Sequence, residues 1–549
     1  PAADVRRRNK RAENELRDQF DQQDGANQIT GGASELGQRA QDLADFHAAL
    51  NRSDKEVEVE ATTLFVTSAD DPQLAMRRAQ ALRDSFKQYE FHLEAPLGGQ
   101  EELWWAAWPG VPARSKVWEF AQITTGREFS TGVPIVGFRL GDATGARMGT
   151  NISCGRRAPV LVDRVATLEA NLSACFAAVA ELGAGKSVLM KADMGAMLDR
   201  GGRVLAIDRT ERREYAEFAA AMRPDKKQIV DLLGPTISLD PLRIFKPARA
   251  ARMVQSLFAT MLGVSMRDPR GTKLASLLQP AYLEEHRIAS LRDMDEHLAT
   301  LKGDVAEELS GLIRSVSQSE LGEVLFNDTL PPLDTSARAI VFLTRGLTLP
   351  DERELSTPHL FNEMPPEKIV GRAIYAMLTS LMRSLCFEDP NDIAGAYIDE
   401  AYFVTSSPEG VRDLRLLIQD GRKHGAYVGL ASHDPEHFGD AVMRGLIPER
   451  YVMRQRNRAL AKRAVLFLTG EDAVEPGEET PEADEQLVEV VTTELSPLDA
   501  DGKVPDGRHG EALMSDRVGL IGKIAKTLPE NPERRAAILS TPLLGKKAA

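Results

Sequence analysis

Residues 180–187 read Ala180-Glu181-Leu182-Gly183-Ala184-Gly185-Lys186-Ser187. An apolar run over 174–179 precedes this octet, and a run with helical character over 188–198 follows it. Strand, glycine-rich turn and helix N-terminus in this order form the loop whose backbone amides hold a phosphate group. The stretch predicts that Glu181 to Val188 bind a nucleoside triphosphate. The alternative is a helix N-terminus that carries Gly-Lys-Ser by chance.

The octet departs from the usual G-x-x-x-x-G-K-[ST] pattern at its first position, where Ala180 replaces glycine. Gly183 and Gly185 remain, so the backbone amides can still turn inward around an anion. An alanine at position 180 requires an ordinary negative φ at that residue. The loop is therefore expected to form, provided that the chain is extended where it enters the turn.

A second motif supplies the acids that nucleotide hydrolysis requires. Residues 396–401 read Ala-Tyr-Ile-Asp-Glu-Ala, an apolar strand that ends in Asp399 and Glu400. A parallel strand would place both acids at the same end of the sheet as the phosphate loop. We expect Ser187 and Asp399 to hold Mg²⁺, and Lys186 to bridge the β- and γ-phosphates. Glu400 would polarise the attacking water.

Two further polar residues end predicted strands. Asp208 closes the strand over 203–208, where it could face the nucleotide or cap the helix that follows; both roles remain open. His433 follows the strand over 427–431, where a polar side chain can sense the γ-phosphate. A helix-capping or loop role is the alternative for His433.

An arginine that reaches a neighbouring subunit's nucleotide would neutralise the charge that develops during hydrolysis. The candidates in this sequence are Arg422, Arg444, Arg454 and Arg456. Most arginines on a protein surface are simply solvated, so the sequence nominates this group without choosing among its members.

Composition narrows the class of protein. The 549 residues are 42% hydrophobic and 27% charged, with a net charge of −14, which is typical of a globular protein with two or more domains. A protein that coats DNA over a broad face is usually basic, although a pore lined with Lys and Arg is compatible with this balance. The three cysteines show no metal-ligand spacing, and no stretch reaches the roughly 18 apolar residues of a membrane span.

The chain divides into three predicted parts. Residues 1–55 read as a charged helical segment with a basic start at 6–8, and residues 56–160 as a smaller α+β domain. Residues 161–549 alternate strands and helices, which predicts right-handed crossovers and a mostly parallel sheet. Within this last part, residues from about 246 to 335 have helical periodicity and predict an all-α insertion. The fold class is therefore α/β.

Taken together, these motifs resemble the ATPases of conjugative transfer and type IV secretion, in particular the large TraC-like class of the HerA–FtsK superfamily. The resemblance rests on residues 181–187, 204–208, 397–401, 421–425, 430–433 and 510–519. It implies a RecA-like P-loop motor domain that works as a hexamer at the inner face of the cytoplasmic membrane, with inner-membrane channel components as partners. His433 departs from the family, because it stands where the family usually has Gln. Family members also carry a longer N-terminal region.

The sequence thus favours a cytoplasmic, peripherally attached ATPase that uses ATP and Mg²⁺ to energise DNA or protein transfer through such a channel. Ala180 favours one alternative, a nucleotide-binding structural component with weak or no hydrolysis. The other alternative is a translocase or helicase that acts directly on duplex DNA. The acidic balance of the chain disfavours this last hypothesis.

Overall fold

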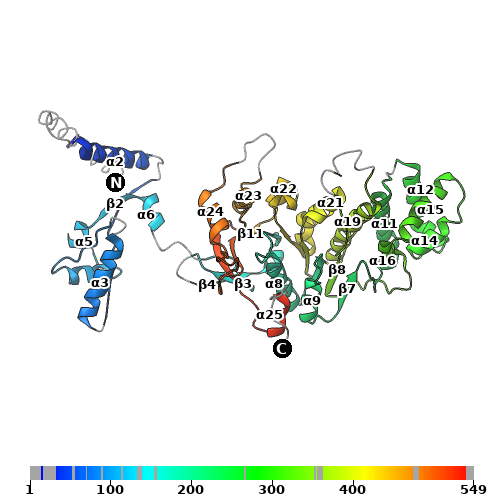
Figure 1. Cartoon of the computed structure of the whole chain (residues 1–549), viewed down its shortest axis with the longest axis horizontal. Helices are drawn as coiled ribbons and strands as arrows, with labels where there is room; N and C mark the ends of the chain where they lie inside the picture. The colour runs from blue at the N-terminus through cyan, green and yellow to red at the C-terminus, as the bar shows by residue number, and fades with distance from the viewer. Residues whose placement is uncertain are drawn as a thin grey trace. The chain divides into compact units, whose positions relative to one another are not determined.

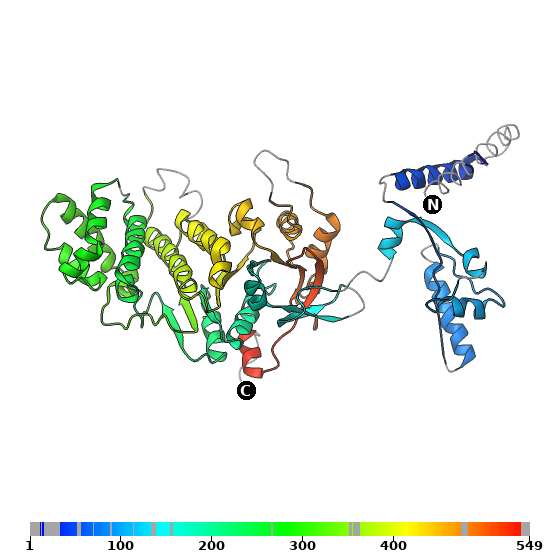
Figure 2. The same ribbon diagram turned by 180° about the vertical axis from the view of Figure 1, so that it is seen from behind.

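The computed structural model describes residues 11, 14–15, 33–51, 56–69, 71–87, 91–112, 115–132, 139–153, 157–264, 267–350, 354, 363–473 and 481–539. These fall into two compact units, Pro1–Gly137 and Phe138–Ala549 (Figures 1 and 2). The predicted basic start at 6–8 and Cys154 lie outside the described residues. Among the described residues, no helix combines the length and the apolar character that crossing a membrane requires.

The first unit is a small α+β assembly. Its elements are α2 (Ala33–Asn51), β1 (Glu58–Ala61), α3 (Pro72–Lys87), α4 (Gln100–Ala106), α5 (Ser115–Glu119), β2 (Gln122–Thr125) and α6 (Gly126–Gly132). β1 pairs antiparallel with β2. Each of these two strands is four residues long. Residues 91–93 have no regular structure.

The second unit is built on one sheet of eleven strands. In spatial order they are β4 (Ala158–Val162), β3 (Ala146–Asn151), β13 (Ile521–Lys526), β12 (Glu511–Ser515), β11 (Glu449–Met453), β5 (Phe176–Val179), β10 (Ala426–Ser432), β9 (Ala394–Asp399), β6 (Arg203–Asp208), β8 (Ala339–Leu343) and β7 (Lys227–Asp231). The run from β11 to β7 is parallel, and β12, β13, β3 and β4 extend it antiparallel. The mostly parallel sheet predicted from the sequence is confirmed.

Helices cover this sheet and join its parallel strands. They are α7 (Arg164–Glu169), α8 (Lys186–Asp199), α9 (Glu214–Ala221), α19 (Pro366–Cys386), α20 (Tyr402–Thr405), α21 (Pro408–Asp420), α22 (Ala441–Gly445), α23 (Arg458–Thr469), α24 (Glu485–Glu489) and α25 (Pro532–Ile538). Short helical turns are η2 (Gly421–His424), η3 (Pro435–Phe438) and η4 (Val490–Glu494). The central strands β5, β6 and β8 are buried along their whole length, as expected for parallel strands with both faces covered.

The helical insertion lies between β7 and β8. It contains α10 (Pro241–Ile244), α11 (Pro247–Leu262), α12 (Pro269–Leu277), α13 (Pro280–Glu285), α14 (Leu291–Leu298), α15 (Asp304–Ser317), η1 (Glu320–Gly322) and α16 (Glu323–Phe326). Figures 1 and 2 show these helices at one end of the sheet and the antiparallel strands at the other. The insertion is therefore an addition beside the β7 edge, and the middle of the sheet is left free for the loops that follow β5, β9 and β10.

The boundary between the two units differs from the sequence-based division at residue 160. β3 and β4 form a hairpin that pairs with β13, near the other end of the chain. This hairpin therefore belongs to the second unit, which begins at Phe138. Pairing between segments some 370 residues apart leaves no local pattern in either segment, which is why the strands could not be assigned to the larger sheet beforehand.

Candidate nucleotide-binding site

The phosphate loop joins β5 to α8, as the sequence predicts. Gly183 has φ +74° and Gly185 has φ +110°, and Lys186 is the first residue of α8. Both glycines occupy backbone conformations that a side chain would strain. The glycine-rich turn therefore forms at the N-terminus of a helix, where backbone amides and the helix dipole favour a bound anion.

Ala180 does not disturb this loop. Among the described residues it is absent from those with positive φ, so it keeps the ordinary backbone that alanine prefers. Its amide donates to the Ser432 carbonyl at 3.2 Å and thereby continues the pairing of β5 with β10. Its carbonyl accepts a hydrogen bond from Lys186 Nζ at 2.9 Å. Glycine is therefore not required at position 180, because the backbone there does not have a positive φ.

The metal-binding pair predicted from the sequence is brought together. The strand register places Asp399, at the end of β9, beside Ala431 of β10, whose next residue pairs with Val179 of β5. Ser187 Oγ consequently donates to Asp399 Oδ2 at 2.8 Å. Adjacent ligands of an octahedral Mg²⁺ lie about 3 Å apart when each bond is about 2.1 Å. A hydroxyl and a carboxylate at this separation therefore fit Mg²⁺.

Burial raises the pKa of Asp399, and the neighbouring Glu400 raises it further, although the Ser187 hydroxyl opposes both effects. An acid whose ionised form is disfavoured in this way gains from a nearby cation. The electrostatics of the site therefore agree with its geometry, because both favour a metal ion at the Ser187–Asp399 pair.

Tyr215 is a third member of this group, and no motif in the sequence indicated it. Its buried hydroxyl donates to Asp399 Oδ2 at 2.9 Å, the same oxygen that Ser187 contacts. Asp208 fixes its position, because Asp208 Oδ2 accepts from the Tyr215 amide at 2.9 Å. Asp208 also accepts from the amide and hydroxyl of Thr210. Asp208 thus accepts from the first turn of α9, whose N-cap residue is Arg213, and its contact with the nucleotide stays a prediction.

Replacing Tyr215 with phenylalanine is expected to weaken the metal-dependent part of nucleotide binding. The ring still fills its space, but Asp399 loses a donor that fixes its orientation, and losing such a support typically costs about 10- to 100-fold in metal affinity. Calorimetric titration with ADP should show weaker binding in the presence of Mg²⁺ and unchanged binding without it. Tyr282→Phe, in the helical insertion, is the matched control. An unchanged Mg²⁺ requirement in Tyr215→Phe would contradict this role.

Glu400 and His433 form a pair beside the loop. His433 Nε2 lies 3.0 Å from Glu400 Oε1, and His433 Nδ1 lies 2.8 Å from the Ala180 carbonyl oxygen. Both ring nitrogens face acceptors, so the imidazole is held best when both are protonated. Accordingly, the hydrogen bond to Glu400 raises the pKa of His433, against the effect of burial.

Glu400 itself has φ +65°, which is rare for a residue with a long side chain. The neighbouring hydrogen bonds account for this backbone, because the Ala401 amide donates to the Ala431 carbonyl at 2.9 Å. Burial acts to raise the pKa of Glu400, but its hydrogen bond to His433 and the charges of His433 and Lys186 lower it overall. Glu400 is therefore an ionised carboxylate held in a fixed, strained position, as a residue that orients water requires.

The raised pKa of His433 makes stability depend on pH. A histidine whose folded-state pKa lies above its usual value of about 6.5 stabilises the fold below that value, and the contribution is lost as pH rises through the folded pKa. Wild-type protein should therefore have its full stability advantage over His433→Gln below about pH 6.5 and lose it as the pH rises above that value. Thermal unfolding at pH values on both sides of about 6.5 measures the effect, with His509→Gln as an exposed control. Parallel melting curves for wild type and His433→Gln would contradict it.

The predicted arginines are spread over different parts of the unit. Arg454 Nε contacts Glu181 at 2.5 Å and Arg456 Nε contacts it at 3.1 Å, so both bind the phosphate loop of their own chain. Arg422 lies before β10, at the opposite end of the sheet, and donates to the Asn171 carbonyl. Arg444 pairs with Asp472. The structure thus brings Glu181, Lys186, Ser187, Asp399, Glu400 and His433 together, and separates Arg422 and Arg444 from them.

Lys186 points back along the loop. Its ammonium donates to the carbonyls of Ala180 at 2.9 Å and Glu181 at 3.3 Å, and lies 3.3 Å from His433 Nδ1. Burial lowers the pKa of Lys186, and the charges of Glu400 and Asp399 oppose that shift. The amine therefore lies among the loop, Glu400 and His433, where phosphate oxygens would meet all three.

The chain is similar to known proteins in sequence and in fold. A family model described as an AAA-like domain matches residues 163–528. No curated protein matches the sequence. VirB4 of Thermoanaerobacter pseudethanolicus is 16% identical, and the match covers 72% of this chain and 100% of VirB4 with a TM-score of 0.50. Plasmid coupling protein TrwB in complex with ADP and Mg²⁺ is 16% identical, covering 73% of this chain and 99% of TrwB with a TM-score of 0.41.

The likeness to VirB4 extends over the whole of that protein and shows a shared P-loop fold. Together with the family match, it confirms the resemblance that the motifs indicated. Because the matched region spans more than half of the sequence, the chain belongs to the family of AAA-like domain proteins.

Proposed function

We propose that this protein binds ATP with Mg²⁺ and hydrolyses it to energise the transfer of DNA or protein through a type IV secretion or conjugation channel. The observation that carries the proposal is the 2.8 Å contact between Ser187 and Asp399, with Glu400 and His433 beside it. Family membership and the shared fold with VirB4 support the class of machine.

Each residue has a defined part in the proposed reaction. The loop amides and Lys186 bind the phosphates, and Ser187 and Asp399 hold the metal. Mg²⁺ supplies charge neutralisation at the β- and γ-phosphate oxygens. Glu400 orients the attacking water, and His433 holds Glu400 through their 3.0 Å contact. His433 also reaches the loop carbonyl of Ala180, so it can report the state of the phosphates to both motifs.

The arginines suggest how subunits cooperate. A group that serves a neighbouring subunit's nucleotide must lie away from its own, and both Arg422 and Arg444 meet this condition. Arg444 is engaged by Asp472, whereas Arg422 is exposed. Arg454 is buried and tied to Glu181 within its own chain, while Arg456 makes the same contact from an exposed position. We assign Arg422 the role in trans and the other two the support of their own loop. A ring of subunits, a hexamer by family resemblance, would bring these groups together at the membrane's inner face.

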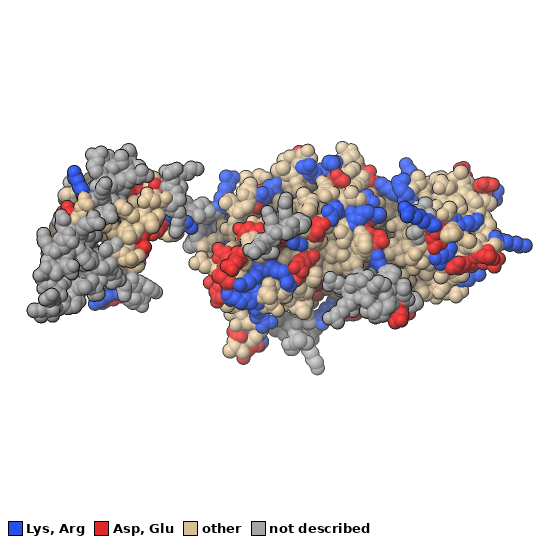
Figure 3. All heavy atoms as spheres, turned by 90° about the horizontal axis from the view of Figure 1, so that it is seen from above, with Lys and Arg blue, Asp and Glu red and all other residues tan. Residues whose placement is uncertain are grey.

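A nucleotide-binding component without turnover was the main alternative, and Ala180 was the feature in its favour. The extended backbone at Ala180 removes that reason. A translocase acting on duplex DNA over a broad surface has no support from the charge distribution. On the face that Figure 3 presents, basic and acidic side chains are interspersed over the described part of the chain.

Phosphate release from ATP tests the proposal directly. The full chain should release phosphate steadily with Mg²⁺ and stop when the metal is chelated. The assay is repeated with DNA and with membrane vesicles, because a motor of this class should respond to its substrate or channel. ATP binding without steady phosphate release under all three conditions would favour the non-hydrolysing component instead.

A further inference from the structure

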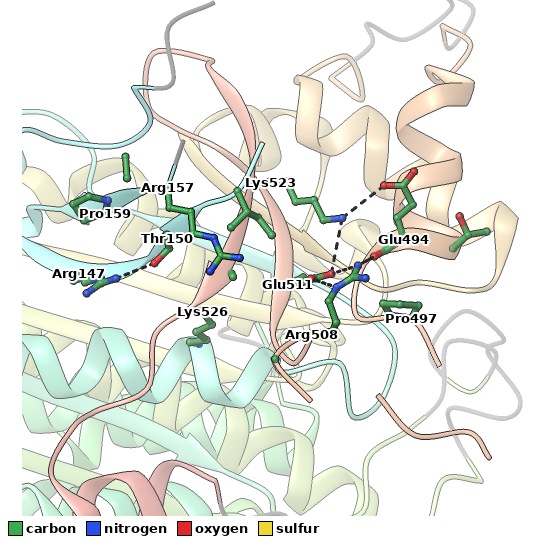
Figure 4. Close-up of a pocket in the computed structure, with 15 residues that line it drawn as sticks. Arg147, Thr150, Arg157, Pro159, Glu494, Pro497, Arg508, Glu511, Lys523 and Lys526 are labelled. Atoms are coloured by element: carbon green, nitrogen blue, oxygen red, sulfur yellow. Dashed lines mark hydrogen bonds and ion pairs between the residues drawn. The ribbon is translucent and has the colours of Figure 1, made fainter. Parts of the chain in front are cut away.

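A cavity of about 950 Å³ opens at the antiparallel end of the sheet (Figure 4). β3, β4, β12 and β13 line it, together with the residues around η4. Its volume lies within the range of about 300–1,000 Å³ that is usual for ligand-binding pockets. Its charged lining residues, Lys526 aside, are Arg147, Arg157, Arg508, Lys523, Glu494 and Glu511. The reaction proposed above uses none of these side chains.

Positive charge is in excess in this cavity. Four of these side chains are cationic and two are acidic, although the chain as a whole carries −14. Lys526 also lines the cavity, but burial, with the charge of Lys191, lowers its pKa well below the usual range. It therefore carries a positive charge less readily than the other cations of the cavity. A local field of this kind attracts anions regardless of the net charge of the protein.

The two acids are already engaged, and the excess charge lies on two exposed arginines. Buried Glu511 pairs with Arg508, and Lys523 lies 3.6 Å from Glu494 and 3.9 Å from Glu511. By contrast, Arg147 donates to the neutral hydroxyl of Thr150 at 2.9 Å. Within the described residues, Arg157 has no acidic partner. Arg147 and Arg157 are therefore available to an anion that enters the cavity.

The chemistry of the walls indicates which anion. Guanidinium groups match the oxygens of a phosphate in paired hydrogen bonds. No aromatic ring is among the described residues that line the cavity, so a nucleobase would find no stacking surface. The cavity therefore suits a ligand recognised through its phosphates, and a nucleic-acid backbone fits this better than a free nucleotide, whose base also needs a partner.

A chain of contacts joins this cavity to the phosphate loop. Glu511 Oε2 accepts from the Ser496 amide at 2.9 Å, and Ser496 Oγ accepts from the Glu511 amide at 3.0 Å. The Ser496 carbonyl accepts from Arg454 Nη1 at 2.6 Å, and Arg454 Nε contacts Glu181. Ser496 has φ +42°, and it follows the π-helical turn η4. Strained residues and π-helical turns often mark functional positions.

We propose that this cavity binds the phosphodiester backbone of a nucleic-acid strand, and that binding is transmitted to the phosphate loop through Glu511, Ser496 and Arg454. A phosphate that draws Arg508 away from Glu511 changes the partners of the acid that holds Ser496. Ser496 then shifts the carbonyl that anchors Arg454, and Arg454 holds Glu181 in the loop. The transmission step rests on the proposed ATPase function, whereas the binding step does not.

Binding is measured first, without ATP, as the fluorescence anisotropy of a labelled oligothymidylate titrated with the full chain. The variant Arg147→Gln/Arg157→Gln removes the two available charges. It should bind about tenfold or more weakly, and the slope of log K against log salt should fall in magnitude by about 1.4. Arg292→Gln/Arg412→Gln removes two exposed arginines elsewhere and should behave as wild type. Equal affinity and equal slope for the cavity variant would overturn the proposal.

Two further arms separate the remaining outcomes. Pyrophosphate and ATP are tested as competitors, and their binding at the cavity without any oligothymidylate binding would overturn the nucleic-acid assignment. The oligothymidylate should also raise the rate of phosphate release in wild type, but not in the cavity variant, whose basal rate stays unchanged. Arg454→Gln removes the side chain that joins the Ser496 carbonyl to Glu181, so it should keep the binding and lose the stimulation relative to its own basal rate. If wild type binds the strand yet hydrolyses no ATP, the ATPase proposal fails and the binding site stands.

Discussion

Replacing Lys186 with alanine should abolish ATP turnover and leave the fold intact. The ammonium is the only lysine nitrogen that the described contacts place among the loop carbonyls, His433 and the acids of β9. Removing one charge-stabilising donor of this kind typically lowers kcat by about 10²–10³-fold. Steady-state phosphate release measures the loss. Because Lys186 contacts only its own loop and neighbours of the site, thermal unfolding should show little change.

The matched control for this variant is Lys226→Ala, which removes an exposed lysine near the start of β7. It should hydrolyse ATP at the wild-type rate. Undiminished turnover in Lys186→Ala would end the assignment of residues 180–187 as a catalytic phosphate loop. A Lys186→Ala protein that fails to unfold cooperatively would instead show a structural role, and Lys186→Met, which keeps the aliphatic stem, then replaces it in the assay.

Glu400→Gln should separate ATP binding from ATP hydrolysis. Glutamine preserves the shape of the side chain and one acceptor for His433, so nucleotide affinity should be nearly unchanged. The charge that polarises water is lost, and removing a general base typically costs about 10²–10⁴-fold in rate. Equilibrium binding of a fluorescent ATP analogue and single-turnover phosphate release measure the two effects separately. The variant should therefore accumulate as an ATP complex.

Glu409→Gln is the control for this second variant, since Glu409 pairs with Arg372 at the start of α21 and contacts no residue of the site. The comparison also decides between the motor and the non-hydrolysing component. If Glu400→Gln leaves the rate of phosphate release unchanged, Glu400 does not act on water. The non-hydrolysing interpretation would then account better for the site, even though Ala180 gives it no support.

Much of the site could be predicted because its parts are local patterns. The glycine-rich turn is specified by consecutive residues, and so is the pair of acids at the end of β9. Parallel pairing then forces both to one end of the sheet, because every strand from β11 to β7 runs in the same direction. The contact between Ser187 and Asp399 follows from this geometry, although 212 residues separate them in sequence.

Other contacts could not be predicted, because they join segments whose sequences contain no pattern that links one segment to the other. Tyr215 donates to Asp399 from a helix whose first turn donates to Asp208. Arg454 and Arg456 are two of the four candidates for a neighbouring nucleotide, and both contact Glu181 of their own loop. The partner of a side chain depends on the order of the strands and on how the helices pack. The few residues next to that side chain in the sequence determine neither of these.

The sequence by itself predicted the chemistry proposed here: a turn for phosphate, a hydroxyl and an acid for a metal, and an acid for water. It also determined the α/β class, since alternating strands and helices favour parallel pairing. Only the tertiary structure decided which sheet the β3–β4 hairpin joins and which side chains hold Asp399 in place. It also decided that a basic cavity is connected to the phosphate loop by a series of hydrogen bonds. The physical reason is the distance along the chain over which each feature is decided. Backbone conformation depends on neighbours in sequence, whereas the partners of a strand or side chain across the sheet depend on how the whole core packs.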